Sequence, residues 1–147
     1  MSSHTLFFTI PGMPMGKARP RFRRNGMAYT PKETKQYEQK IKDIALHQAN
    51  ICQYIKPSED TPMRMHITAW YPIPASYSNK KRQQIQDGTL QPNKKPDLDN
   101  IMKIIADALN HIAYHDDKQI VECVLRKQYV AENNDPNVAV FVEAMYE

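Results

Sequence analysis

Four parts of the chain alternate apolar and polar side chains, which predicts four β-strands. These parts are residues 5–10, 63–71, 120–130 and 138–142. An alternation with a period of two is typical of a strand that buries one face and exposes the other. The last two parts are joined by the turn-forming sequence Asn133–Pro136, so we expect them to pair as a terminal β-hairpin.

Two longer segments repeat apolar residues at helical spacing. Thr30, Pro31 and Glu33 form a capping-box pattern, from which we expect a helix of about five turns. A second helix is expected to begin after Pro96. A shorter helix is expected within residues 76–95, with Ser76 or Ser78 as its N-cap. The core-facing stripe of the second helix comprises Ile101, Ile104, Ile105, Ala108 and Ile112.

The chain of 147 residues has the composition of one globular domain, with 41% hydrophobic and 24% charged residues. We therefore expect a single α/β (α+β) domain over residues 1–147, with a small mixed sheet of about four to five strands and two longer helices. The first residues do not resemble a secretory signal, and no apolar stretch is long enough to cross a bilayer, so we expect a cytoplasmic protein without a membrane partner. Cys52 and Cys123 are far apart in the sequence, which argues against a disulfide framework or a zinc site.

The charge is distributed unevenly along the chain. The overall net charge is +4, but residues 1–96 hold 16 Lys and Arg against 6 Asp and Glu, whereas residues 97–147 hold 4 against 10. A basic surface attracts phosphates, and concentrated carboxylates can hold a cation that a phosphate bridges. The contrast favours a nuclease, although a chance asymmetry of solvated faces stays open as the alternative.

A basic segment near the N-terminus is expected to form a ribbon. Lys17, Arg19, Arg21 and Arg23 fall at every second position, so an extended backbone places them on one side. Asn25-Gly26 is a strong hairpin signal. The ribbon could contact DNA phosphates through these residues, or it could be an exposed edge that charge keeps soluble.

A second basic patch is expected around the short helix. It consists of Lys80, Lys81, Arg82, Lys94 and Lys95, which we treat as further candidates for phosphate contact. Trp70, Tyr71 and Tyr77 lie near this patch in the sequence. Such rings can stack on unpaired bases, but packing in the core is the commoner use.

Acidic residues gather around the start of the second helix. Asp97 and Asp99 lie near its first turn, and Lys103 falls one turn after Asp99 on the same exposed face. Asp116 and Asp117 follow in the loop before the next strand, which packing could bring near the first pair. Oxygen ligands without histidine or cysteine suit Mg²⁺, with Mn²⁺ as a possible substitute. The alternative is helix capping and an Asp99–Lys103 ion pair, which contributes only ~0.3–0.5 kcal/mol.

The run KPDLDNIMKIIADALN over residues 95–110, followed by HDDKQI over residues 115–120, resembles the signature of the RusA family of Holliday junction resolvases, common in phages and prophages. The basic GKARPRF segment and the Tyr-Thr-Pro sequence before a helix are similar to phage-type members. The resemblance implies a mixed α/β fold, a homodimer, and paired symmetric nicks across a four-way junction during DNA recombination and repair.

By position in the motif, the resemblance implies that Asp97, Asp99 and Asp117 are catalytic, metal-binding acids and that Lys103 is the catalytic lysine. Asp116 matches a neighbouring acid and is a further candidate metal ligand. The implied reaction is phosphodiester hydrolysis with Mg²⁺ held by these acids. Lys103 would stabilise charge on the transition state or orient the attacking water.

Two other functions agree with parts of the sequence. A non-catalytic protein that binds DNA junctions would use the basic segments but would not need Asp97 or Asp99. A metal-dependent hydrolase of nucleotides would need the acids but would bind DNA weakly and regardless of its length. Asp97→Asn and Asp99→Asn should leave the function of a non-catalytic binding protein intact but abolish that of a nuclease. Measuring DNA affinity as a function of DNA length distinguishes the nucleotide hydrolase from a nuclease.

Overall fold

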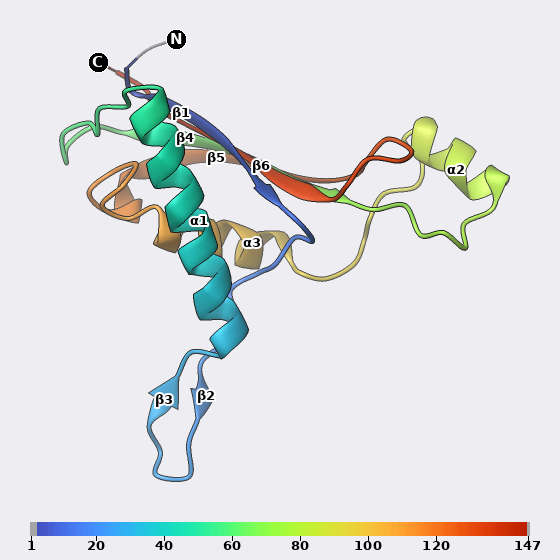
Figure 1. Cartoon of the computed structure of the whole chain (residues 1–147), viewed down its shortest axis with the longest axis horizontal. Helices are drawn as coiled ribbons and strands as arrows, with labels where there is room; N and C mark the ends of the chain where they lie inside the picture. The colour runs from blue at the N-terminus through green and yellow to red at the C-terminus, as the bar shows by residue number, and fades with distance from the viewer. Residues whose placement is uncertain (1–2, 147) are drawn as a thin grey trace.

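The computed structural model describes residues 3–146, which form a four-stranded mixed sheet, a two-stranded ribbon and three α-helices (Figure 1). The main sheet contains β1 (Thr5–Pro11), β4 (Met63–Tyr71), β5 (Ile120–Tyr129) and β6 (Asn137–Ala144). The ribbon contains β2 (Arg21–Phe22) and β3 (Ala28–Tyr29). The helices are α1 (Lys32–Ile51), α2 (Asn79–Gln86) and α3 (Leu98–Ala108), and a short 3₁₀ helix, η1, spans Asp117–Gln119. The predicted mixed α/β class and the four strands of the main sheet are confirmed.

The strand order of the main sheet is β1-β6-β4-β5, with β4 parallel to β5 and the other neighbours antiparallel. The predicted terminal hairpin is therefore wrong, because β4 lies between β5 and β6. Val138, Val140 and Val142 of β6 are fully buried, whereas Tyr129 is the only buried residue of β5. The more buried strand takes a central position and the less buried one takes an edge. Alternation along a strand predicts its buried face but not its neighbours.

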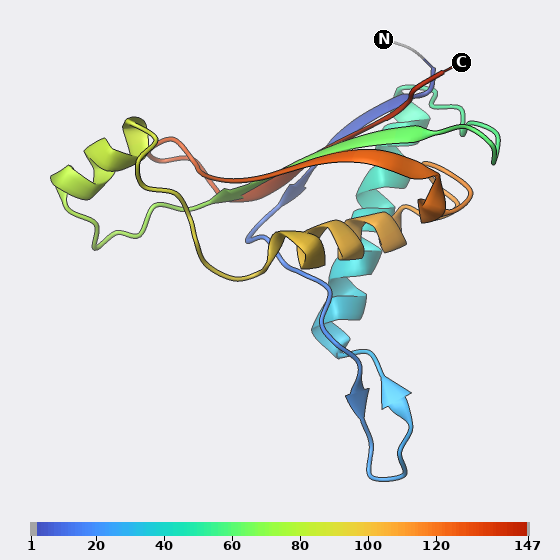
Figure 2. The same ribbon diagram turned by 180° about the vertical axis from the view of Figure 1, so that it is seen from behind.

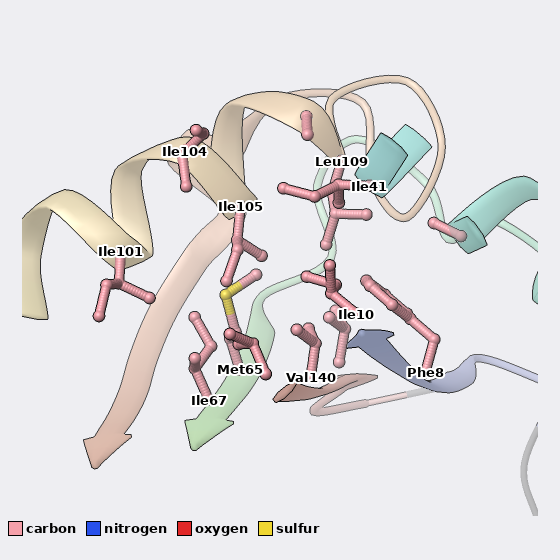
Figure 3. Close-up of a cluster of buried hydrophobic side chains, with 14 of the residues drawn as sticks. Phe8, Ile10, Ile41, Met65, Ile67, Ile101, Ile104, Ile105, Leu109 and Val140 are labelled. Carbon is pink, nitrogen blue, oxygen red and sulfur yellow. The ribbon is translucent and has the colours of Figure 1, made fainter. Parts of the chain in front are cut away.

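Helices α1 and α3 cover the same face of the main sheet, and the hydrophobic core lies between them and the strands (Figures 1 and 2). The first four members of the predicted α3 stripe are fully buried. Ile105 points from α3 toward Met65 on β4 (Figure 3). Ile112 lies beyond the end of α3 and is half-buried, so the stripe ends one turn earlier than predicted.

The two helices with predicted caps begin differently. Pro31 occupies the N-cap position of α1 with an extended backbone (φ −55°, ψ 146°) and no side-chain cap. Thr30 therefore precedes the helix, and the predicted capping box is wrong. In α2 the Ser78 hydroxyl accepts a hydrogen bond from the backbone N–H of Lys81 at 3.2 Å, which confirms the expected serine cap.

Tyr114 closes the C-terminal end of α3. Its side chain is fully buried, and its hydroxyl donates a hydrogen bond to the Ala106 carbonyl at 2.7 Å. Tyr114→Phe keeps the ring but leaves this buried carbonyl without its donor, so we expect the free energy of unfolding to fall by about 1–3 kcal/mol. Urea denaturation would measure the change, with Tyr146→Phe, at an exposed ring, as the matched control. An equal stability of the two variants would contradict a structural role for this hydrogen bond.

Two basic elements project from the body on different sides of α3. The β2–β3 ribbon extends away from one end of α1, and α2 lies beyond one end of the main sheet (Figures 1 and 2). Among residues 3–146, no helix is both long and apolar enough to cross a membrane. The N-terminal end of α3 faces the space between the two projections.

Candidate active site

Asp97 and Asp99 stand at the N-terminal end of α3. Asp97 occupies the N-cap position with an extended backbone (φ −65°, ψ 149°), but its side chain makes no capping hydrogen bond. The first helical bond runs from the Ile101 N–H to the Asp97 carbonyl at 3.1 Å. Both aspartates are exposed. The helix therefore begins with two carboxylates at the surface, and the carboxylate of its N-cap residue is not used in a capping hydrogen bond.

Three of the four predicted catalytic residues line one surface pocket. Its volume is about 220 Å³, and its walls are Asp99, Met102, Lys103, Ala106, Asp117 and Ile120. Helix α3 supplies Asp99 and Lys103, whereas η1 supplies Asp117. The fold thus brings together the two acidic segments that the sequence could only suggest were close.

The fourth predicted residue, Asp97, lines a second pocket around the same end of α3. This pocket has a volume of about 320 Å³, and its walls are Gly16, Lys17, Arg19, Lys95, Pro96, Asp97 and Asn100. Three of these residues are cationic, so the carboxylate of Asp97 stands in a basic environment. An acid-lined pocket and a cation-lined pocket therefore share one helix end.

The turn that carries Asp117 is held by its neighbours. The Asp116 carboxylate accepts a hydrogen bond from the Lys118 N–H at 2.8 Å, which lowers the pKa of Asp116. The buried side chain of Gln119 accepts from the Asp116 N–H at 3.1 Å and donates to the carbonyls of Ser58 and Thr61. These bonds give Asp116 a capping role that the sequence reading had not assigned, and they place Asp117 at the pocket.

Lys103 pairs with an acid other than the expected Asp99. Its ammonium lies 3.0 Å from the Asp107 carboxylate and 3.9 Å from that of Asp117. The hydrogen bond to Asp107, followed by the negative charges of Asp107 and Asp117, raises the pKa of Lys103. Lys103 therefore stays protonated at the mouth of the acidic pocket.

Asp107 is the functional candidate that sequence reasoning did not single out. Besides its bond to Lys103, its carboxylate lies 3.4 Å from the ammonium of Lys17, which also pairs with Glu38. Burial would raise the pKa of Asp107, but Lys103, Lys17 and a hydrogen bond with Asp117 together lower it. The only sequence signal for Asp107 is its position one helical turn after Lys103. Asp99, one turn before Lys103, gives the same signal, so the spacing does not indicate which acid pairs with the lysine.

Lys17 lies apart from the predicted cationic stripe. Its side chain is only 27% exposed and pairs with Glu38 and Asp107. The expectation that four alternating cations share one face therefore fails at Lys17, because the chain adopts a strand only from Arg21 to Phe22. Lys17 therefore belongs to a charge network with Glu38 and Asp107.

Asp117 lies close to a second carboxyl group, that of Asp107. Burial, followed by the hydrogen bond with Asp107, raises the pKa of Asp117, although the charge of Lys103 opposes this shift. Two carboxyl groups in contact repel each other when both are ionised. A cation near both groups would relieve that repulsion, which makes this place favourable for a divalent ion.

The donor atoms suit Mg²⁺ or Mn²⁺ in kind. Asp97, Asp99 and Asp117 offer only carboxylate oxygens, the ligands that these ions prefer. Asp99 and Asp117 line the same pocket, whereas Asp97 lines the adjoining one. In the part of the chain that the structure describes, no three His, Cys, Asp or Glu side chains form a closed cluster. The candidate metal ligands are therefore divided between two adjoining pockets at α3.

The second basic patch contains four exposed lysines and one arginine that is paired within the protein. Lys80 and Lys81 on α2 and Lys94 and Lys95 before α3 are exposed. Arg82, in contrast, pairs with Glu132 and donates to the Tyr77 carbonyl at 3.1 Å. Its guanidinium therefore fastens α2 to the body, which leaves the lysines as the better candidates for DNA contact.

The aromatic residues near this patch are packed in the protein. Tyr71 is fully buried, Trp70 and Tyr77 are half-buried, and the Tyr77 and Tyr129 hydroxyls lie 3.2 Å apart. The ammonium of Lys94 lies 5.3 Å from the centre of the Tyr129 ring. These rings are therefore packed against other parts of the protein, in agreement with the core-packing alternative.

Comparison with known proteins gave a match to a family model over most of the chain. The model described as "Endodeoxyribonuclease RusA" matches residues 11–143. The protein YqaN of Bacillus subtilis (strain 168), described as uncharacterized, is 35% identical over 141 residues, which cover 92% of this chain and 93% of YqaN.

Among solved structures, a GTPγS-form protofilament of Bacillus thuringiensis serovar israelensis TubZ aligns with 95% of this chain at 13% identity and a TM-score of 0.41. The aligned part is 24% of that longer chain. A likeness of this size carries no argument about fold or function.

Proposed function

The chain belongs to the RusA endodeoxyribonuclease family, and from this premise we propose that it is a Mg²⁺-dependent nuclease that resolves four-way DNA junctions by paired, symmetric nicks. The observation that supports this proposal most directly is the shared pocket of Asp99, Lys103 and Asp117. Packing of η1 against α3 assembles acids and a lysine from separate segments. Simple helix capping would not require this arrangement.

Each of these side chains has a role in the proposed hydrolysis. Asp97, Asp99 and Asp117 would hold the divalent ion, which when bound polarises the scissile phosphate and makes an attacking water more acidic. Lys103 carries a fixed positive charge beside the pocket and would stabilise negative charge on the phosphate in the transition state. Asp107 is a positioning residue, because its carboxylate holds the Lys103 ammonium at 3.0 Å.

The cations around the site would bind the DNA backbone. Arg19 and Lys95 line the pocket that contains Asp97, so they would contact phosphates next to the scissile one. Arg21, Arg23, Lys80, Lys81 and Lys94 would contact phosphates further away. Two copies of the chain, each with one such site, would account for two nicks placed symmetrically across a junction.

Cleavage of a labelled synthetic junction tests this function. The purified protein is incubated with a four-way junction or with linear duplexes of the same arm sequences, in Mg²⁺, in Mn²⁺ and in EDTA. We expect two symmetric nicks in the junction with either metal, and none in the duplexes or in EDTA. Tight junction binding without cutting in any metal would favour the non-catalytic alternative, and weak binding independent of length would favour a hydrolase of nucleotides.

The exposed cations should determine how binding depends on salt. We expect Arg21→Gln and Lys80→Gln to weaken junction and duplex binding alike, because phosphate contacts carry no information about sequence or branching. Each substitution should reduce the slope of log Kd against log salt by about 0.9. Fluorescence anisotropy at several salt concentrations would measure this slope. The control is Lys56→Gln, because Lys56 follows the C-terminal end of α1, whereas the ribbon precedes its N-terminal end. Unchanged slopes would exclude these residues from phosphate contact.

A further inference from the structure

The β2–β3 ribbon, with the residues before and between its strands, forms a projecting arm that we define as residues 19–29. Both views show it standing away from the sheet and from α3 (Figures 1 and 2). Every residue from Arg19 to Ala28 is exposed. The arm contributes nothing to the buried core, so burial does not explain its side chains.

The root of the arm is fixed to the helix that carries the candidate catalytic acids. The Lys17 N–H donates to the Asn100 carbonyl at 2.9 Å. A Cβ atom on Gly16 would lie 2.9 Å from the Cβ atoms of Asn100 and Pro96, so this contact requires glycine. The Lys17 ammonium adds ion pairs with Glu38 and Asp107. DNA held at α3 would therefore meet the arm at a defined place.

The arm has two different faces. Arg21 is paired with Tyr29 in the strand register, and the Arg23 guanidinium lies 5.2 Å from the centre of the Tyr29 ring. Phe22 is paired with Ala28, which places both on the opposite face. The Phe22 side chain is 72% exposed. One face is thus cationic, whereas the other presents an uncovered aromatic ring.

The charge of the arm favours nucleic acid over protein as the partner. Residues 17–32 contain no acidic residue, and the arm carries Arg19, Arg21, Arg23 and Arg24. Such a surface attracts phosphates, whereas two copies of it would repel each other. An exposed aromatic ring beside arginines is the combination that stacks on unpaired bases while the backbone is held.

We propose that Phe22 stacks on a base at the branch point of the DNA and so makes the arm a selector for branched over linear substrates. This inference rests on the proposed function of the chain. In a linear duplex each base is already stacked between its neighbours, so Phe22 finds no free base face. Bases at a branch point lose a stacking neighbour more easily, and only there does the ring gain a partner.

Binding measured in EDTA tests the inference without any cleavage. The dissociation constants of wild type, Phe22→Ala and Phe22→Trp are measured for a four-way junction and for a duplex of the same arm sequence. We expect Phe22→Ala to weaken junction binding roughly five- to a hundredfold and to leave duplex binding within about twofold, the range for one base stacked on one ring. Phe22→Trp should retain the preference, because its ring also stacks.

The matched control is Met27→Ala. Met27 is also an exposed apolar residue of the arm, at 64% exposure, but it lies opposite Arg23 and hence on the cationic face. We expect this variant to bind both substrates as the wild type does. A 2-aminopurine at the branch point should change its fluorescence on binding of wild type and Met27→Ala, but not of Phe22→Ala.

Several outcomes would overturn the inference. The first is an unchanged preference of Phe22→Ala for the junction, and the second is an equal loss of affinity for junction and duplex. The third is a loss of dimerisation without a loss of DNA binding, which would mean that the arm contacts a second copy of the chain. The two proposals fail separately. If the protein cuts junctions but Phe22 does not affect binding, the proposed function stands and this inference is wrong. If the protein never cuts but needs Phe22 to bind junctions, the proposed cleavage is wrong and the role of Phe22 in binding stands.

Discussion

Asp99→Asn is expected to reduce the rate of junction cleavage at least about a thousandfold while leaving junction binding intact. Asp99 lines the pocket that also contains Lys103 and Asp117, and asparagine keeps its shape but removes the charge that holds a divalent ion. Losing a metal ligand removes several kcal/mol of transition-state stabilisation, and each 1.4 kcal/mol or so is a factor of ten in rate. Single-turnover cleavage of a labelled junction in saturating Mg²⁺ would measure the loss.

The control for this prediction is Asp135→Asn, which removes an exposed carboxylate from the loop between β5 and β6. It should cut at the wild-type rate, so that the loss in Asp99→Asn cannot be a general effect of charge. Circular dichroism and junction affinity should match the wild type in both variants. Cleavage by Asp99→Asn within tenfold of wild type would remove Asp99 from the catalytic centre.

Lys103→Met is expected to slow cleavage about a hundredfold, and additional Mg²⁺ should not restore the rate. The substitution keeps the length of the side chain but removes the positive charge 3.9 Å from Asp117. Loss of one group that stabilises developing charge typically costs about a hundred- to a thousandfold in rate. A titration of the single-turnover rate with Mg²⁺ separates this effect from weaker metal binding, which excess metal would overcome.

Lys118→Met is the matched control, because Lys118 is an exposed lysine immediately after Asp117. It should lower DNA affinity slightly at most and leave the rate of the bound complex unchanged. Full recovery of Lys103→Met at high Mg²⁺ would mean that Lys103 acts on metal affinity. Equal losses in the two lysine variants would show that only the general charge of the region matters.

The fold was predictable from the sequence element by element, but not in its assembly. Period-two alternation located β1, β4, β5 and β6, and helical spacing located α1 and α3. The same patterns suggested a terminal hairpin, yet β4 separates β5 from β6. An edge strand and a central strand can both alternate, and only the total burial available in the folded sheet decides which strand takes which place.

The candidate site was predictable in its residues and not in its connections. The spacing of Asp99, Lys103 and Asp107 offers Lys103 an acid one turn away in either direction. The structure selects Asp107, which also pairs with Lys17, and Lys17 in turn pairs with Glu38 on α1. Because the choice depends on those distant charges, no local pattern could have made it.

The sequence by itself determined which segments are strands and helices, which face of each is apolar, and which motif places the chain among the endodeoxyribonucleases. These properties depend on residues close together in the chain, and local periodicity records them. Only the tertiary structure decided the order of strands, the meeting of Asp99 with Asp117, the pairing of Lys17 with Asp107, and the exposure of Phe22 on its arm. Each of these depends on which distant surfaces pack together, because burial and ion pairing act through space and not along the chain.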